Sequence, residues 1–171
     1  MKGIILAGGS GTRLNPFNLI TNKHLLPVYN RPVIYYAIEK LVSAGIDRIM
    51  LVTSPHHVND FIKILGSGEN FKSKQNNQQI QIVYGIQNTP SGIADGLYIA
   101  KEYIGHDNCV LYLGDNIIED DVSEQINNFK EGALVFLKEV EDPHRFGIAT
   151  VDSLGNILKI EEKPKQPETN L

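Results

Sequence analysis

The stretch that decides the fold is KGIILAGGSGTRLNP, Lys2–Pro16, in which an apolar run is followed at once by Gly8, Gly9 and Gly11. The apolar run predicts a buried strand, and the glycines predict a tight turn after it. Ligands of α/β sheets bind beyond the carboxyl ends of the strands. Glycines there let backbone N–H groups approach phosphate oxygens closely. The stretch therefore indicates an α/β sheet with a candidate anion-binding loop after its first strand.

Two common phosphate-binding patterns do not fit this loop. Leu14 stands where the dinucleotide fingerprint needs its third glycine, and no Gly-Lys-Ser/Thr sequence follows as in a Walker loop. Pro16 restrains Asn15 and disfavours a helix that begins at once. A plain tight turn stays open as an interpretation. Arg13 favours the functional one, because a guanidinium fork matches phosphate oxygens.

The rest of the chain alternates short apolar runs with segments of helical period. We expect strands at 3–7, 48–52, 80–84, 110–113 and 134–137. We expect helices over 34–42, ending at Gly45, over 93–104, ending at Gly105, and over 122–129, with Asp120 and Asp121 near the positive N-terminus. This order predicts a doubly wound, mainly parallel α/β sheet with a Rossmann-like nucleotide-binding core. A surface loop is expected at 66–79, and a β-hairpin near the C-terminus joins 147–151 to 157–160.

Composition narrows the class of protein. The 171 residues suit one domain, and a net charge of −4 argues against a nucleic-acid partner. Cys109 is the single cysteine, so no intramolecular disulfide forms, and a reducing compartment is favoured. The apolar run 3–7 is far too short to span a bilayer. We therefore expect a cytoplasmic protein without a membrane or nucleic-acid partner.

The run from Lys2 to Pro27, KGIILAGGSGTRLNPFNLITNKHLLP, closely resembles the signature of sugar-1-phosphate nucleotidylyltransferases. The resemblance continues through the base-recognition loop Gly85–Gly96, the metal-binding turn Leu113–Asn116, and the sugar-binding elements Asp142–Gly147 and Glu161–Pro164. It implies a Mg²⁺-dependent, in-line attack of glucose 1-phosphate on dTTP, or another pyrimidine nucleoside triphosphate, which yields dTDP-glucose and pyrophosphate.

The resemblance also implies roles for individual residues. The catalytic residues would be Arg13, Lys23 and Asp115, with Asp115 as the ligand of Mg²⁺. The nucleotide would be bound by Leu6, Gly8, Gly9, Ser10, Gly11, Gln87, Pro90 and Gly92. The sugar phosphate would be bound by Asn116, Phe146, Gly147, Glu162 and Lys163. An amide such as that of Gln87 can pair with a thymine or uracil edge through both its donor and its acceptor.

Several alternatives stay open. The resemblance implies that residues 1–171 form a single nucleotidyltransferase domain, the N-terminal part of a longer enzyme with further strands and a second metal-binding aspartate. The chain is then either active or a truncated nucleotide-binding module with little turnover. A uridylyl- or other nucleotidylyltransferase acting on a related sugar 1-phosphate is a second reading, because Asp95 and Phe146 stand where many relatives have Gln and Tyr. Relatives often assemble, which leaves a homo-oligomer open.

Overall fold

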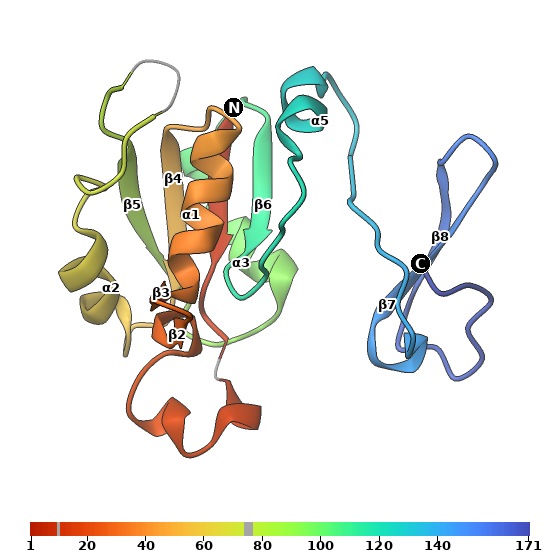
Figure 1. Ribbon diagram of the computed structural model, residues 1–171, viewed down its shortest axis with the longest axis horizontal. Coiled ribbons are helices and arrows are strands. Elements are labelled where there is room, and N and C mark those ends of the chain that lie inside the picture. The colour runs from red at the N-terminus through yellow and green to blue at the C-terminus, as the bar shows by residue number, and fades with distance from the viewer. Residues whose placement is uncertain (10, 74–76) are drawn as a thin grey trace. The chain divides into compact units, whose positions relative to one another are not determined.

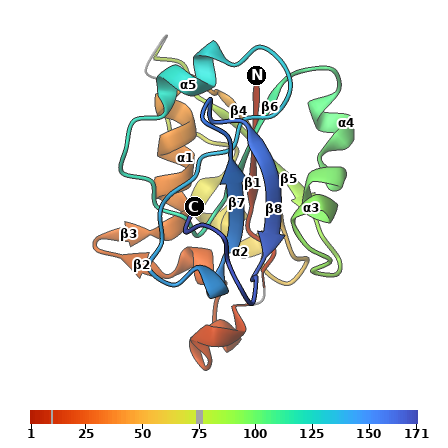
Figure 2. The same ribbon diagram turned by 90° about the vertical axis from the view of Figure 1, so that its right-hand side faces the viewer.

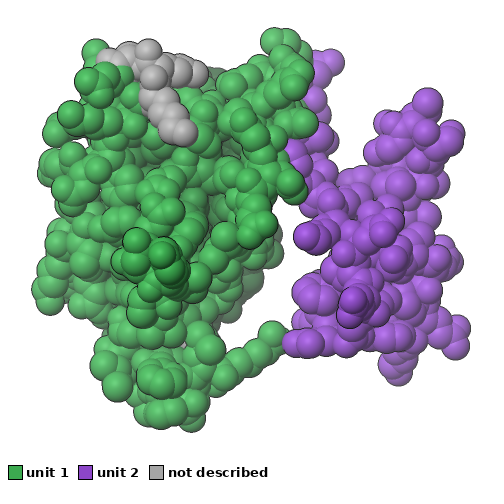
Figure 3. Space-filling model, in the orientation of Figure 1, with its two compact units in different colours: residues 1–130 green, residues 131–171 purple. Residues whose placement is uncertain are grey.

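The computed structural model describes residues 1–9, 11–73 and 77–171, and it divides into two compact units (Figure 3). The first unit covers residues 1–130, and the second covers residues 131–171. The first holds a sheet of four parallel strands and a short antiparallel pair, and the second holds an antiparallel pair of its own. The main sheet of the first unit is the frame on which the candidate site is built.

This main sheet has the strand order β5-β4-β1-β6, with every neighbouring pair parallel (Figure 1). The strands are β1 Lys2–Leu6, β4 Arg48–Thr53, β5 Gln81–Ile86 and β6 Cys109–Leu113. The central strand β1 pairs with two neighbours, so that Ile4 lies beside Met50 on one side and Leu111 on the other. The predicted doubly wound, mainly parallel sheet is confirmed.

Both faces of the sheet are buried, which explains why its strands are continuous apolar runs. Ile5, with its side chain on one face of β1, packs in a cluster with residues of α1 (Val33–Ser43) and α2 (Val58–Leu65). Ile4 lies on the other face, in a cluster with residues of α3 (Ile93–Ile99) and α4 (Lys101–Ile104). Figure 2 shows α1 and the pair α3 and α4 on opposite sides of the sheet.

Helix α1 ends as its glycine predicts. Gly45 has φ +82 and donates to the carbonyl of Val42, while the N–H of Ile46 donates to the carbonyl of Leu41. These two bonds form a Schellman motif, which satisfies carbonyls at the helix end.

The remaining elements of the first unit are α5 Ser123–Asn128, β2 Pro27–Val28, β3 Arg31–Pro32 and the 3-10 turns η1 Thr12–Leu14, η2 Phe17–Leu19 and η3 Lys23–Leu25. None of the described helices has the length and apolar character that a membrane crossing requires.

Two predicted elements differ from the structure. The helix expected over 93–104 is two helices, α3 and α4, interrupted where Ala100 donates to the carbonyl of Leu97 in a tighter i to i−3 bond. The strand expected at 134–137 is wrong. Its four side chains are 50, 49, 46 and 39% exposed, and the run has no ladder partner among the described residues. An apolar run becomes a strand only where a neighbouring backbone supplies its hydrogen bonds.

The second unit is the predicted hairpin. Strands β7 (Gly147–Val151) and β8 (Ile157–Glu162) pair in antiparallel register, and the 3-10 turn η4 (Pro143–Arg145) precedes them. The Asp152 carboxylate accepts from the N–H groups of Leu154 and Asn156 at 2.9 and 2.8 Å, which closes the turn between the strands. The predicted loop at 66–79 is partly described and carries Phe71 into the core of the first unit, while residues 74–76 lie outside the described part.

Candidate nucleotide-binding site

The glycine loop begins where β1 ends, at the carboxyl edge of the parallel sheet. Leu6 is the last residue of β1, and its carbonyl accepts the N–H of Gly114 at 3.0 Å, which ties the loop to the turn after β6. Gly11 adopts a left-handed conformation with φ +60, and only the short 3-10 turn η1 follows it. The described chain after Gly11 therefore continues as a 3-10 turn and not as an α-helix. The predicted Ser10 lies outside the described residues.

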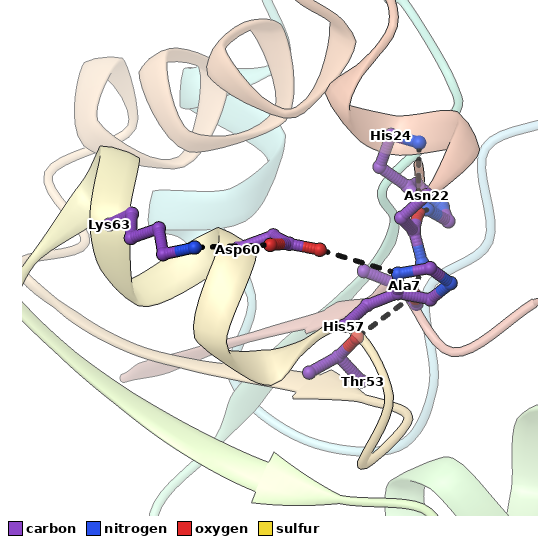
Figure 4. Close-up of polar contacts among 7 residues, drawn as sticks. All are labelled: Ala7, Asn22, His24, Thr53, His57, Asp60 and Lys63. Carbon is purple, nitrogen blue, oxygen red and sulfur yellow. Dashed lines mark hydrogen bonds and ion pairs between the residues drawn. The ribbon is translucent and has the colours of Figure 1, made fainter. Parts of the chain in front are cut away.

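A buried polar network holds the chain after this loop against the end of β1 (Figure 4). The Ala7 carbonyl accepts from Asn22 Nδ2 at 3.1 Å and from Thr53 Oγ1 at 3.3 Å. Asn22 Oδ1 accepts the backbone N–H of His24 at 3.0 Å and lies 2.6 Å from His24 Nδ1. Because Asn22 Oδ1 is an acceptor, His24 Nδ1 carries the proton. Lys23, between the two buried residues, is thereby held at the glycine loop.

His24 is 1% exposed, and burial together with the neighbouring Lys23 charge lowers the pKa of its imidazole from 6.5 to about 4, against the opposing effect of Asp115. Asn22 and His24 were not among the predicted site residues. Asn side chains often cap short turns by accepting the backbone N–H two residues further on, so Asn22 could have been predicted as a turn cap. That both side chains are buried beneath the loop follows only from the tertiary structure.

Lys23 and Asp115 form an ion pair at the centre of the site. The lysine side chain runs along the glycine loop, because a Cβ on Gly9 would lie 3.4 Å from Lys23 Cε and one on Gly11 would lie 3.3 Å from Lys23 Cβ. The lysine and aspartate side chains are 24 and 42% exposed, so both charges remain open to solvent and to a ligand. A side chain at Gly11 would crowd the lysine, whereas one at Gly9 would make ordinary contact with it.

Asp115 follows β6 and Gly114, as predicted, and its carboxylate reaches the edge of the sheet. Its burial raises the pKa of the carboxyl, but the hydrogen bond and charge of Lys23, together with His24, outweigh this effect, so the pKa lies below its usual value. Asp115 is therefore ionised at neutral pH. Within the described part of the chain, no three His, Cys, Asp or Glu side chains gather as a metal cluster. Asp115 thus stands without further carboxylates gathered around it, and a single carboxylate would suit Mg²⁺ held jointly by protein and phosphate oxygens.

Gln87 lies on the other side of the glycine loop, directly after β5. Its backbone N–H donates to the carbonyl of Thr53 at 2.8 Å, and its side chain is buried. Nε2 donates to Asp95 Oδ2 at 2.7 Å and to the Gly92 carbonyl at 3.3 Å. A Cβ on Gly8 would lie 2.7 Å from Oε1, so a larger residue there would displace the amide. The donor end of the amide is thus bonded within the chain, a contact that the sequence analysis did not foresee.

The other residues predicted for the first unit lie on the connections that follow β1, β5 and β6. Gly92 immediately precedes α3 with φ +103, and no atom lies within 4 Å of a Cβ built on it, so its backbone is open to a ligand. Pro90 is exposed in the same connection. Asn116 is exposed beside Asp115, and its N–H donates to the Leu113 carbonyl at 3.0 Å. Arg13 is exposed on η1, and no carboxylate among the described residues pairs with it.

The residues predicted to bind the sugar phosphate from the second unit meet at one end of its hairpin. Gly147 pairs with Glu162 across β7 and β8, and the N–H of Lys163 donates to the Phe146 carbonyl at 2.9 Å. Lys163 has φ +47, an uncommon conformation for a residue with a side chain. Its Nζ lies 2.9 Å from Glu162 Oε1. The hairpin therefore gathers a cation, a carboxylate and an exposed aromatic ring.

A family model described as nucleotidyl transferase matches residues 2–171. The chain belongs to the nucleotidyl transferase family. A glucose-1-phosphate thymidylyltransferase of Neisseria gonorrhoeae is 43% identical over 174 residues, covering 99% of this chain and 58% of that protein. A low-salt glycan biosynthesis nucleotidyltransferase of Haloferax volcanii is 40% identical over 174 residues, covering 100% of this chain and 47% of that protein. This nucleotidyl transferase therefore spans about half to three fifths of the length of these relatives.

Solved structures agree with the family. A Bacillus anthracis protein assigned as a glucose-1-phosphate thymidylyltransferase, crystallised in complex with sucrose, superposes with a TM-score of 0.90 at 44% identity, covering 99% of this chain and 67% of that one. A UDP-glucose pyrophosphorylase complexed with UDP-glucose superposes with a TM-score of 0.77 at 21% identity, a likeness of fold alone. The parallel sheet with helices on both faces is thus the fold of nucleotidyl transferases.

Proposed function

We propose that this nucleotidyl transferase moves a thymidylyl group from dTTP to glucose 1-phosphate and releases pyrophosphate. The observation that carries the proposal is the Lys23–Asp115 pair, held against the glycine loop at the carboxyl edge of the sheet with the Gln87 amide on the loop's other side. A cation, a carboxylate and a stretch of side-chain-free backbone at one edge suit a polyphosphate. The relatives named above support the choice of substrates.

In the proposed reaction, a phosphate oxygen of glucose 1-phosphate attacks the α-phosphorus of dTTP. A new P–O bond forms, and the bond between the α-phosphorus and the bridging oxygen breaks, so that its electron pair leaves with pyrophosphate. The two reactants repel one another, so the protein must mainly align them and supply positive charge. No covalent intermediate on the protein is required.

Each residue of the candidate site has a proposed role in this reaction. Lys23 would neutralise phosphate oxygens near the reacting phosphorus, and Arg13 would meet the departing pyrophosphate. The backbone of Leu6, Gly8, Gly9, Ser10 and Gly11 would lie against the nucleotide, with Gln87, Pro90 and Gly92 around the base. Asp115 would hold Mg²⁺, since carboxylate oxygens are ligands that this ion prefers. The bound ion would screen the charge that develops on the phosphates.

For the sugar phosphate, the proposal keeps the residues that the family resemblance implies, Asn116, Phe146, Gly147, Glu162 and Lys163. Lys163 would bind the phosphate, and Glu162 would accept hydrogen bonds from sugar hydroxyls. Phe146 would contact the sugar with its aromatic ring, and Gly147 would contact it with its backbone. The proposed domain is the single nucleotidyltransferase domain of residues 1–171, part of a longer enzyme. The proposed compartment is the cytoplasm, which suits the free thiol of Cys109.

A uridylyltransferase is the second candidate, because the Gln87 amide suits uracil as well as thymine. Thymine and uracil present the same hydrogen-bonding edge, so an amide such as that of Gln87 does not separate them. The test measures pyrophosphate release by this chain with glucose 1-phosphate, Mg²⁺ and each of dTTP, UTP and dATP. We expect turnover with dTTP, a smaller or equal rate with UTP, and none with dATP.

Substituting the central lysine tests the site itself. Lys23→Met removes the charge at the glycine loop and should lower the rate at least about 100-fold, because one lost charge contact in a site of this kind is worth about 3 kcal/mol. Lys63→Met, which removes an exposed lysine of α2, is the matched control and should retain the wild-type rate. Equal rates for Lys23→Met and wild type would overturn the assignment. Binding of dTTP without pyrophosphate release would establish a nucleotide-binding module instead.

A further inference from the structure

The side chain of Gln87 has one orientation in this site, and Asp95 determines it. Both N–H groups of the amide have acceptors within the chain, Asp95 Oδ2 at 2.7 Å and the Gly92 carbonyl at 3.3 Å. Reversing the amide would bring Oε1 to the position of Nε2. It would then face a carboxylate oxygen and a carbonyl oxygen, neither of which donates a hydrogen bond. The shorter contact is a hydrogen bond to a charged group, which is stronger than a neutral one.

The orientation decides what Gln87 offers to a ligand. Its Oε1 lies toward the glycine loop, 2.7 Å from the place that a Cβ on Gly8 would occupy. No donor among the described residues bonds to Oε1. The side chain is 8% exposed, so it has little freedom to reorient. Gln87 therefore presents an acceptor to the site, with its donors turned away.

Nucleobases differ at the atom that would meet such an acceptor. Thymine and uracil carry an imide N–H at the middle of their pairing edge, whereas cytosine carries a bare ring nitrogen there, itself an acceptor. A site whose polar group is left facing another acceptor rejects the wrong ligand strongly, because both groups lose water without gaining a partner.

We propose that Asp95 is a specificity-determining positioning residue, which holds the Gln87 amide with its carbonyl toward the base so that the site accepts thymine or uracil nucleotides and rejects cytosine nucleotides. The inference rests on the function proposed above and deepens it. Asp95 acts through Gln87 and touches no reacting atom. Its side chain comes from the first turn of α3, three residues after Gly92, where the preceding loop ends.

The test compares the binding of dTTP, UTP and dCTP to the whole chain by titration calorimetry in the presence of Mg²⁺. We expect the wild type to bind dTTP and UTP about 100-fold more tightly than dCTP. Asp95→Asn should reduce this ratio at least tenfold, because an Asn at position 95 can either accept or donate and so allows the Gln87 amide to reverse. Asp95→Glu retains the carboxylate and should restore most of the ratio.

Controls separate the inference from the function on which it rests. Glu102→Gln removes one charge from exposed α4 and should leave the ratio at the wild-type value. Circular dichroism confirms that each variant folds, and Asp95→Ser replaces Asp95→Asn if the latter does not. A wild type that binds none of the three nucleotides overturns the proposed function. A wild type that discriminates, with Asp95→Asn or Asp95→Ser discriminating equally well, overturns the inference alone.

Discussion

The buried His24 should make this protein lose stability as the pH falls, in a range where exposed carboxylates have little effect. Burial lowers the pKa of its imidazole from 6.5 to about 4. Between these two values the unfolded chain binds a proton that the folded chain does not bind. The contribution of neutral His24 to the free energy of unfolding is therefore fully present above pH 6.5. It decreases as the pH falls toward about 4.

The size of the effect follows from the two pKa values. Each pKa unit corresponds to about 1.36 kcal/mol, so the difference between 6.5 and about 4 corresponds to about 3 kcal/mol. The structure supplies the cause. Nδ1–H is bonded to Asn22 Oδ1, so the second proton would enter a ring that is 1% exposed, beside the Lys23 charge.

Urea unfolding at a series of pH values measures this effect. The chain has no tryptophan, and all seven of its tyrosines lie in residues 1–130, so tyrosine fluorescence reports on the first unit. His24→Asn keeps an amide donor near Asn22 but cannot titrate. The wild type should lose about 3 kcal/mol more than this variant over the same pH range.

Exposed His106 provides the control, because His106→Asn should follow the wild-type curve. Proton NMR of the imidazole rings gives an independent measurement of the same quantity. Parallel curves for the wild type and His24→Asn, or a His24 ring that titrates near pH 6.5 in the folded protein, would refute the reasoning.

Two further changes address the same edge of the sheet. Lys23→Met should raise the pKa of the Asp115 carboxyl, because the variant loses the hydrogen bond and charge that lower this pKa. Carboxyl carbon NMR measures the titration of Asp115, and an unchanged midpoint would contradict the prediction. Asn22→Ala should lower the free energy of unfolding by about 1–3 kcal/mol, because it leaves buried polar groups unpaired. Thr53→Val removes only one bond to the Ala7 carbonyl, so it should lower the free energy of unfolding less than Asn22→Ala does. Urea unfolding compares the two variants, and the reverse order would contradict the role given to Asn22 in the buried network.

Local sequence patterns were enough to predict the strands of the main sheet and the ends of two helices. A strand buried on both faces must be apolar at every position, so 3–7 and 48–52 could be recognised without a partner in view. Gly45 and Gly105 mark helix ends because both have a positive φ, which glycine adopts at little cost. Asp115 was predicted at the sheet edge because it directly follows an apolar strand.

Other features depend on contacts between distant parts of the chain. The run 134–137 has the composition of a strand but no backbone partner in the described structure, and composition cannot supply one. Helix α2 was not predicted. Only the fold brings Asn22 to Ala7 and joins Gln87 to Asp95, so neither contact could be predicted from the sequence.

The sequence by itself determined the four strands of the main sheet, the glycine loop at the end of β1, and the side chains available at the sheet edge. These depend on periodicity and backbone freedom, which are properties of neighbouring residues. Only the tertiary structure decided that Lys23 meets Asp115 and that the Gln87 amide has a single orientation. Such contacts join residues far apart in the chain, and their direction depends on which atoms the fold brings within hydrogen-bonding distance.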